Sequence, residues 1–157
     1  MDPTAQMTDL AQIRHFVLAG RALFTIVSKR TSERRTFRIR AGSPTAAYPR
    51  PGHFVDVLAG PDNERDYRYV GFMHEGDDGA LRFKSRAETT ESADQIFQWF
   101  LGALNSAHGV GPGARGIAFT AQAEFWHAGR CGRCGRTLTT PESVASGIGP
   151  VCEGRES

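Results

Sequence analysis

Cys131-Gly-Arg-Cys134 and the later Cys152 contain every cysteine of this 157-residue chain. Two thiolates in a C-x-x-C spacing can bind one metal ion without strain, because the turn between them brings both sulfurs to the same side. Cys152 follows after the 17 residues 135–151 and would close a loop over the ion. A structural zinc site needs four ligands in a tetrahedron. The three cysteines therefore predict one structural zinc ion per chain and leave one ligand to be found.

The fourth ligand of the predicted site is His127, four positions before Cys131. A Cys3His set is a standard shell for structural zinc. Glu153 or a group from outside the chain is the alternative. An iron–sulfur site, a disulfide with one free thiol, and a redox pair are the other interpretations. A redox C-x-x-C opens a helix after a strand, whereas Gly135-Arg136 and a loop follow here, so the pattern favours zinc.

The loop between Cys134 and Cys152 carries signals for one short helix. Thr139 can cap it, Glu142 can close a capping box, and a proline stands in its first turn. Gly147 is expected to end it. The segment has few large apolar side chains, so metal binding, worth roughly 10–16 kcal/mol in zinc-finger peptides, would supply the missing stability.

A resemblance rests on Cys131-x2-Cys134-Gly-Arg-Thr-Leu-Thr-Thr-Pro-Glu-Ser143 followed by Gly147-Ile-Gly-Pro-Val-Cys152. These motifs resemble the zinc knuckle of a family of uncharacterised small proteins of actinobacteria and their phages. The similarity covers about residues 124–153 and extends more weakly to a turn at residues 60–63. It implies a zinc module at the end of a β-rich domain. It implies no activity, so the function has to be inferred from the residues.

The composition is that of a soluble globular protein, with 39% hydrophobic and 23% charged residues. No apolar run approaches the ~18–20 residues of a membrane span, and Met1-Asp-Pro-Thr does not open a secretory signal. We therefore expect a cytoplasmic protein without a membrane partner, in which thiols stay reduced and can ligate metal.

Apolar periodicity and turn residues predict an α+β fold. Five strands are expected, over residues 23–29, 35–40, 53–59, 67–74 and 80–86. They should form an antiparallel β-meander or a partly closed barrel. A weak amphipathic helix is expected over residues 8–19. A stronger helix over 92–107 should pack on the sheet, because its large apolar side chains form one stripe.

The expected organisation is a β-rich domain over residues 1–108, a Gly-rich connector over 109–116 and a zinc-knuckle module over 117–157. The connector contains Gly111-x-Gly113-x-x-Gly116. That fingerprint binds phosphate only after a strand and at the start of a helix. Here it follows a predicted helix and precedes a strand predicted over 117–127, so no phosphate loop is expected.

Basic residues suggest a nucleic-acid surface. Of the 19 basic residues 17 are arginines, which suit phosphate contacts, although a GC-rich genome is the simpler explanation of their number. If two predicted strands turn their basic side chains to one solvent face, the patch contacts phosphates. Pairing with the acidic stretch 56–78 is the alternative. The candidate nucleic-acid-binding residues are Arg38, Arg40, Arg82 and Lys84 on the strands, Arg130, Arg133 and Arg136 on the knuckle, and Trp126 as a stacking residue.

An enzyme is the weakest interpretation. Asp62, Glu64 and Asp66 resemble the start of a calcium loop, but the sixth-position glycine and the closing glutamate are missing. His53 and His74 have no marked nucleophile, and a full Cys3His shell leaves no position for catalytic water. The leading hypothesis is a nucleic-acid-binding or adapter protein of a phage or mobile element. A protein-interaction module docking on a host protein comes second, and a metal-dependent nuclease or hydrolase third.

Overall fold

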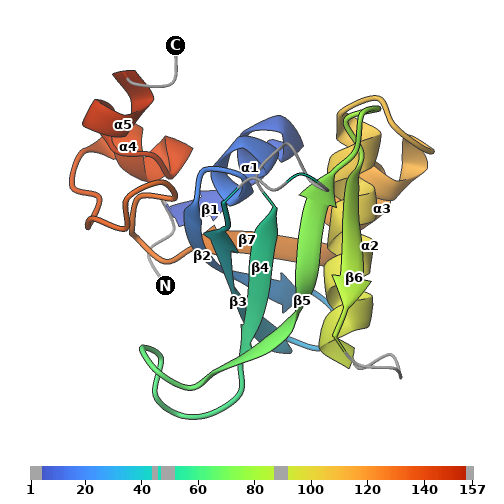
Figure 1. Ribbon diagram of the computed structural model, residues 1–157, viewed down its shortest axis with the longest axis horizontal. Coiled ribbons are helices and arrows are strands. Elements are labelled where there is room, and N and C mark those ends of the chain that lie inside the picture. Colours follow the sequence, from blue (N-terminus) through green and yellow to red (C-terminus); the bar gives the residue numbers. More distant parts are fainter. Residues whose placement is uncertain (1–4, 44–45, 47–51, 87–91, 155–157) are drawn as a thin grey trace.

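The computed structural model describes residues 5–43, 46, 52–86 and 92–154. They form one seven-stranded antiparallel sheet in the order β1-β7-β2-β3-β4-β5-β6 (Figure 1). The strands are β1 (Gln6–Met7), β2 (Arg21–Ser28), β3 (Arg34–Ala41), β4 (His53–Leu58), β5 (Tyr67–Glu75), β6 (Leu81–Ser85) and β7 (Ala123–His127). The predicted α+β fold is confirmed. The sheet is not closed, because β1 and β6 remain its two edges.

Five helices accompany the sheet. They are α1 (Leu10–Val17), α2 (Ser92–Ala107), α3 (Ala114–Gln122), α4 (Pro141–Ser146) and α5 (Pro150–Gly154). Figure 1 shows α2 directly behind β6 with α3 beside it, whereas α4 and α5 lie at the other end of the molecule. The bounds of α2 match the predicted helix. In the described part of the chain, no helix has the length and apolar character needed to cross a membrane.

The strand predicted over residues 117–127 is wrong in its first half, where α3 stands instead. The reason is contact with α2. Helical spacing puts Gly116 and Phe119 on one face, and both are buried. The Gly116 N–H donates to Ser106 Oγ at 2.9 Å, and a Cβ on Gly116 would come within 2.8 Å of that oxygen. Because α3 begins at Ala114, the last glycine of the Gly-rich motif lies inside α3. The motif nevertheless follows the helix α2, whereas a phosphate-binding fingerprint follows a strand.

Phenylalanines dominate the core between the sheet and the helices. Phe24 packs on Phe100 with ring centroids 5.5 Å apart, and Phe37 packs on Phe97 at 5.4 Å. Phe125 of β7 stacks on Phe24 at 4.7 Å. Alternation along each strand then turns the intervening side chains to the other face of the sheet. On that face most side chains are exposed or half-buried.

A β-bulge decides which side chains of β5 reach that open face. The pairing of β4 with β5 shifts between Val55 and Asp56, and Val70 is the extra residue. One added residue reverses the alternation beyond it. Tyr69 therefore lies opposite Asp56, and Phe72 lies opposite Phe54, on the same face. The neighbouring Gly71 has to be glycine, because a Cβ there would come within 2.5 Å of the carbonyl oxygen of Lys84.

Candidate functional site

The three cysteines come together in the structure. Their sulfur atoms all lie within 4.8 Å of one another, and all three are free thiols. A tetrahedral ion with metal–sulfur distances of ~2.3 Å needs sulfurs about 3.8 Å apart. Cys131, Cys134 and Cys152 are therefore positioned to hold a metal ion.

Backbone N–H groups prepare the sulfur of Cys131 for a metal. Burial would raise the pKa of this thiol, but the N–H groups of Gly149, Cys134 and Arg133 point at it and lower its pKa to about 7. The Gly149 and Arg133 bonds measure 3.2 and 3.4 Å. Donors aimed at a thiolate stabilise the charged form. Burial and the two other thiols raise the pKa of Cys152 to about 11, so its proton has to leave when a metal binds.

Phe16 of α1 anchors the cysteine loops to the body of the protein. Its fully buried ring packs against Gly132 and Gly147, and a Cβ on either glycine would come within 2.6 Å of the ring. The Arg21 N–H of β2 donates to the Gly132 carbonyl at 2.6 Å. As predicted, α4 ends at Gly147, which has φ of 75°. Its N-cap is Thr140 rather than Thr139, and α5, which carries Cys152, was not predicted.

His127 does not join the thiols, contrary to the predicted Cys3His shell. Both of its ring nitrogens face backbone groups: Nδ1 accepts from the Gly129 N–H at 3.0 Å, and Nε2 lies 2.5 Å from the Val144 carbonyl oxygen. The alternation of β7 buries its ring beside Phe16, at a centroid distance of 5.9 Å. His127 thus ties β7 to α4, and among the described residues the metal-ligand group consists of three cysteines.

A second feature lies on the open face of the sheet, where two arginines share one buried carboxylate. Arg38 Nε donates to Asp56 Oδ2 at 2.9 Å. Arg40 donates to both oxygens, from Nε at 2.8 Å and from Nη2 at 3.2 Å. The Asp56 side chain is 3% exposed, against 36% for Arg38 and 47% for Arg40. The hydrogen bond with Asp56 raises the pKa of Arg40 further.

Aromatic rings surround this pair of arginines. The Arg38 guanidinium lies 4.3 Å from the centroid of the Tyr67 ring, and that of Arg40 lies 5.5 Å from Phe54. Phe54 is 38% exposed and contacts the rings of Tyr69 and Phe72, with centroids 6.1 and 5.6 Å away. The prediction of a basic face missed these rings. Alternation along β4 is enough to place Phe54 on the open face. Phe72 reaches that face only because of the bulge in β5, and the sequence gives no clear signal for that bulge.

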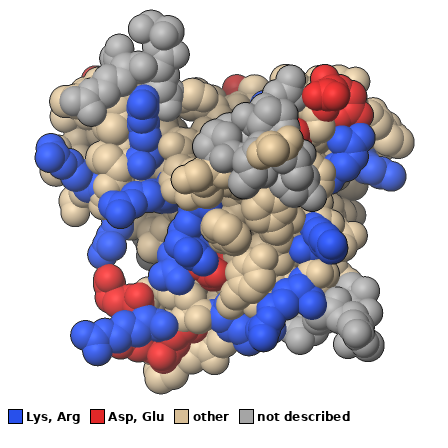
Figure 2. All heavy atoms as spheres, in the orientation of Figure 1, with Lys and Arg blue, Asp and Glu red and all other residues tan. Residues whose placement is uncertain are grey.

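The remaining candidates on the strands share this face. Strand register puts Lys84 opposite Phe72, and Arg82 opposite His74. Arg82 pairs with Asp78 at 2.9 Å. Trp126 of β7 lies half-buried opposite Thr25 of β2. In Figure 2, basic side chains are spread over the side of the molecule that faces the viewer, with uncharged surface and a few acidic side chains between them.

The three arginines of the knuckle have separate surroundings. Arg130 forms an ion pair with Glu64 at 2.9 Å, which links the knuckle to the turn between β4 and β5. Arg133 Nη1 donates to the Cys152 carbonyl at 3.4 Å. Arg136 is exposed and lines a cavity of about 320 Å³ beside the cysteines.

Asp62 and Asp66 accept hydrogen bonds within the acidic turn at residues 62–66, whereas Glu64 pairs with Arg130. Asp62 Oδ1 accepts from the Glu64 N–H, and Asp66 Oδ2 accepts from the Asp62 N–H at 2.7 Å. These bonds stabilise the turn. His53 is buried, and its Nε2 lies 3.4 Å from the Leu18 carbonyl oxygen. Burial lowers the pKa of His53.

Residues 121–157 match the model of a family of unknown function, DUF6011. The match spans β7, the cysteine loops and the two C-terminal helices. This agrees with the resemblance of the knuckle to proteins without a known activity. No curated protein and no solved structure matches the chain.

Proposed function

We propose that this protein binds single-stranded nucleic acid on the open face of its sheet, with a structural zinc ion in the C-terminal knuckle. The observation that carries the proposal is the pair of stacked contacts on that face, Arg38 over Tyr67 and Arg40 over Phe54. Exposed rings stack on bases, and neighbouring cations contact phosphates.

A sheet face of this kind favours single strands. Bases in a duplex are stacked on each other, and only unpaired bases are free to lie on aromatic side chains. Phe54, Tyr69 and Phe72 form one contiguous group of rings. Stacking on them would be tolerant of sequence, because every base has a flat face.

The open face stays positively charged, because its arginines are not fully neutralised by their acidic partners. Arg38 and Arg40 share the single carboxylate of Asp56, so these three side chains together carry a net charge of +1. A guanidinium has five N–H donors, so each arginine keeps donors beyond those that Asp56 uses. Asp78 and Arg82 are both about half exposed, and pairs of this kind contribute little to stability. A phosphate would replace Asp78 at small cost.

Zinc is the metal proposed for the knuckle. Thiolate ligands select zinc, copper(I) or iron–sulfur clusters over hard cations. One ion bound by Cys131, Cys134 and Cys152 would connect the turn after β7 to α5. Its proposed role is to hold the knuckle and its exposed Arg136 in place. A setting in a phage or mobile element rests on the resemblance alone.

Fluorescence anisotropy with labelled single-stranded DNA, single-stranded RNA and duplex DNA tests the proposal. We expect the single strands to bind more tightly than the duplex. Phe54→Ala and Tyr69→Ala should each weaken binding about tenfold, since a stacked base is worth about 1–3 kcal/mol. The matched control is Arg115→Ala, which removes an exposed arginine of α3. Affinity weaker than ~10⁻⁴ M at physiological salt would reject the proposal.

The same measurements distinguish nucleic-acid binding from a protein-interaction module, which would also explain the exposed aromatic group. Phosphate binding weakens steeply with added salt, whereas an interface built on aromatic packing does not depend on counterion release. If no oligonucleotide binds, a protein partner becomes the better explanation of the exposed Phe54 and its neighbouring rings.

A further inference from the structure

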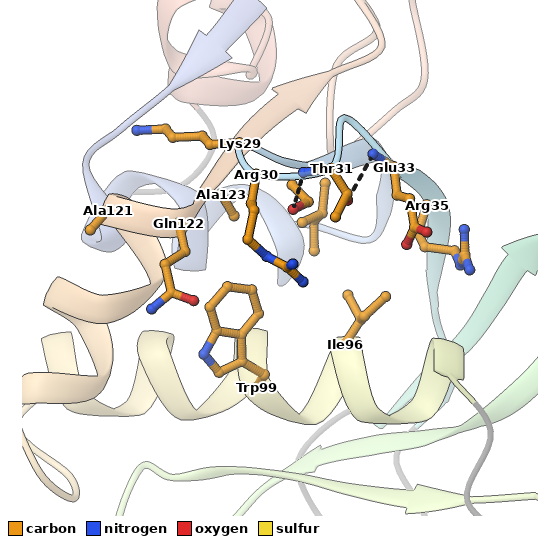
Figure 3. A pocket seen from close by; sticks show the side chains of 12 residues that line it. Lys29, Arg30, Thr31, Glu33, Arg35, Ile96, Trp99, Ala121, Gln122 and Ala123 are labelled. Atoms are coloured by element: carbon orange, nitrogen blue, oxygen red, sulfur yellow. Dashed lines mark hydrogen bonds between the residues drawn. The ribbon is translucent and has the colours of Figure 1, made fainter.

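A separate cavity of about 700 Å³ lies on the helix side of the sheet, where the turn between β2 and β3 projects past α2. Its lining comes from three distant segments: the β2–β3 hairpin, α2, and the junction of α3 with β7. Figure 3 shows Ile96 and Trp99 rising into it from α2 and Arg30 descending from the turn. The volume lies within the range of small-molecule sites.

Trp99 offers a fixed aromatic surface in this cavity. Its ring packs on Phe119 of α3 with centroids 4.8 Å apart, so one side is held by the core. The indole is half-buried. Figure 3 shows it directed into the hollow, with the Gln122 side chain beside it. A flat ring could stack on the indole while the Gln122 amide, which both donates and accepts hydrogen bonds, meets its polar edge.

The opposite wall is a basic turn that is held by hydrogen bonds. Ser28 Oγ accepts from the Thr31 N–H, and Thr31 Oγ1 accepts from the Glu33 N–H, both at 3.3 Å. Lys29 binds the end of α3, with its backbone N–H on the Gln122 carbonyl and its Nζ on the Thr120 carbonyl, both at 2.9 Å. These bonds order the turn before any ligand arrives, which reduces the entropy lost on binding.

Charge on the lining favours an anion. Lys29, Arg30 and Arg35 face the single acid Glu33, a net charge of +2. Lys29 is bound to α3, and Arg35 donates to the Arg34 carbonyl at 3.0 Å. We assign the ligand contact to Arg30, because Figure 3 shows its guanidinium above Trp99.

We propose that this cavity binds a nucleoside 5′-monophosphate group, with the base on Trp99 and the phosphate on Arg30. The group could be a free mononucleotide or the phosphorylated 5′ end of a strand. The cavity lies on the helix side of the sheet, so the site does not depend on the function proposed for the open face.

Tryptophan fluorescence tests the site directly. The chain has two tryptophans, so in Trp126→Phe the emission comes from Trp99 alone. We expect 5′-AMP and 5′-CMP to quench it saturably, with dissociation constants below about 1 mM. Adenosine and inorganic phosphate should each bind about tenfold more weakly, because each lacks one of the two contacts. Calorimetry on the unsubstituted chain checks that the tryptophan replacement has no effect of its own.

Two variants and one control decide the outcome. Arg30→Ala should weaken binding about tenfold or more, as loss of a charge-assisted hydrogen bond does. Trp99→Phe removes the fluorescent reporter, so its affinity is measured by calorimetry; it keeps an aromatic ring and should weaken binding less. Arg115→Ala, an exposed arginine at the other end of α3, should change nothing. Absence of saturable quenching up to about 1 mM, or equal binding by Arg30→Ala, would overturn the proposal.

Oligonucleotides distinguish the two sources of the ligand. If a 5′-phosphorylated oligonucleotide quenches Trp99 and its unphosphorylated counterpart does not, the site binds strand ends. If only mononucleotides respond, the ligand is a free nucleotide. Mononucleotide binding without any oligonucleotide binding would support this site and reject the function proposed for the open face.

Discussion

Arg40 binds Asp56 with two hydrogen bonds across β3 and β4, although strand register puts Arg38, and not Arg40, directly opposite this carboxylate. Arg40 reaches it diagonally. The carboxylate is buried, whereas both guanidiniums stay partly exposed. One acid thus positions two cations on the open face.

Asp56→Ala should lower the free energy of unfolding by about 2 kcal/mol, since hydrogen bonds to charged groups contribute about 1.5–3 kcal/mol and the arginines remain partly hydrated. Asp56→Asn should cost less, because it keeps an acceptor oxygen. Urea denaturation measures both. The exposed pair provides the control: Asp78→Ala should cost under about 1 kcal/mol. Equal losses at the two positions would contradict the structural role of Asp56.

Replacing Arg38 and Arg40 together by Ala should weaken nucleic-acid binding for all sequences alike. It should also reduce the slope of log K against log salt by roughly one to two units, since each lost phosphate contact removes about 0.7–0.9 of a unit. Arg136→Ala should act in the same direction without loosening the knuckle. Arg133 is less suited to this test, because its side chain contacts the Cys152 carbonyl. An unchanged slope would show that these arginines do not contact phosphate.

The purified protein should carry about one zinc ion per chain, and Cys134→Ser should lose it. His127→Ala should keep the ion, although it should unfold more easily by about 1–3 kcal/mol, because it leaves buried backbone groups unpaired. Elemental analysis of the folded variants measures the metal. A folded His127→Ala protein without zinc would restore His127 as a ligand.

A cobalt(II) form should report the fourth coordination position. The described residues supply three thiolates, and a cavity lies beside them. We expect tetrahedral cobalt, with intense visible absorption bands. Added imidazole or a small thiol should shift these bands by taking the fourth position. Bands that stay unchanged at saturating imidazole would mean that the chain itself provides the fourth ligand.

Stability should fall below neutral pH because of His53. Burial lowers its pKa in the folded state, while the unfolded chain takes up a proton near pH 6.5. The stability that depends on a neutral His53 is therefore fully present above pH 6.5. It is lost as the pH falls from 6.5 through the lower pKa of His53 in the folded state. Urea denaturation of wild type and His53→Gln between pH 7.5 and 5 measures it. The cysteine site is common to both, so their difference isolates His53, and parallel curves would contradict the prediction.

Local patterns in the sequence determined much of the architecture. The apolar stripe of α2 depends on neighbours three or four residues away, the alternation in β3 on neighbours two residues away, and the end of α4 on Gly147 with its positive φ. The metal site could be predicted from the three cysteines in the same way, because ligand type and spacing suffice for such a prediction.

Contacts between distant segments decided the rest. Residues 114–122 became a helix because Gly116 and Phe119 pack on α2. His127 lies apart from the three thiols because Gly129 and Val144 backbone groups bind its ring. The extra residue in β5 brought Phe72 beside Phe54, and register brought Asp56 between two arginines. Each outcome depends on a contact with a residue that is distant in the sequence. The spacing of nearby residues does not determine such a contact.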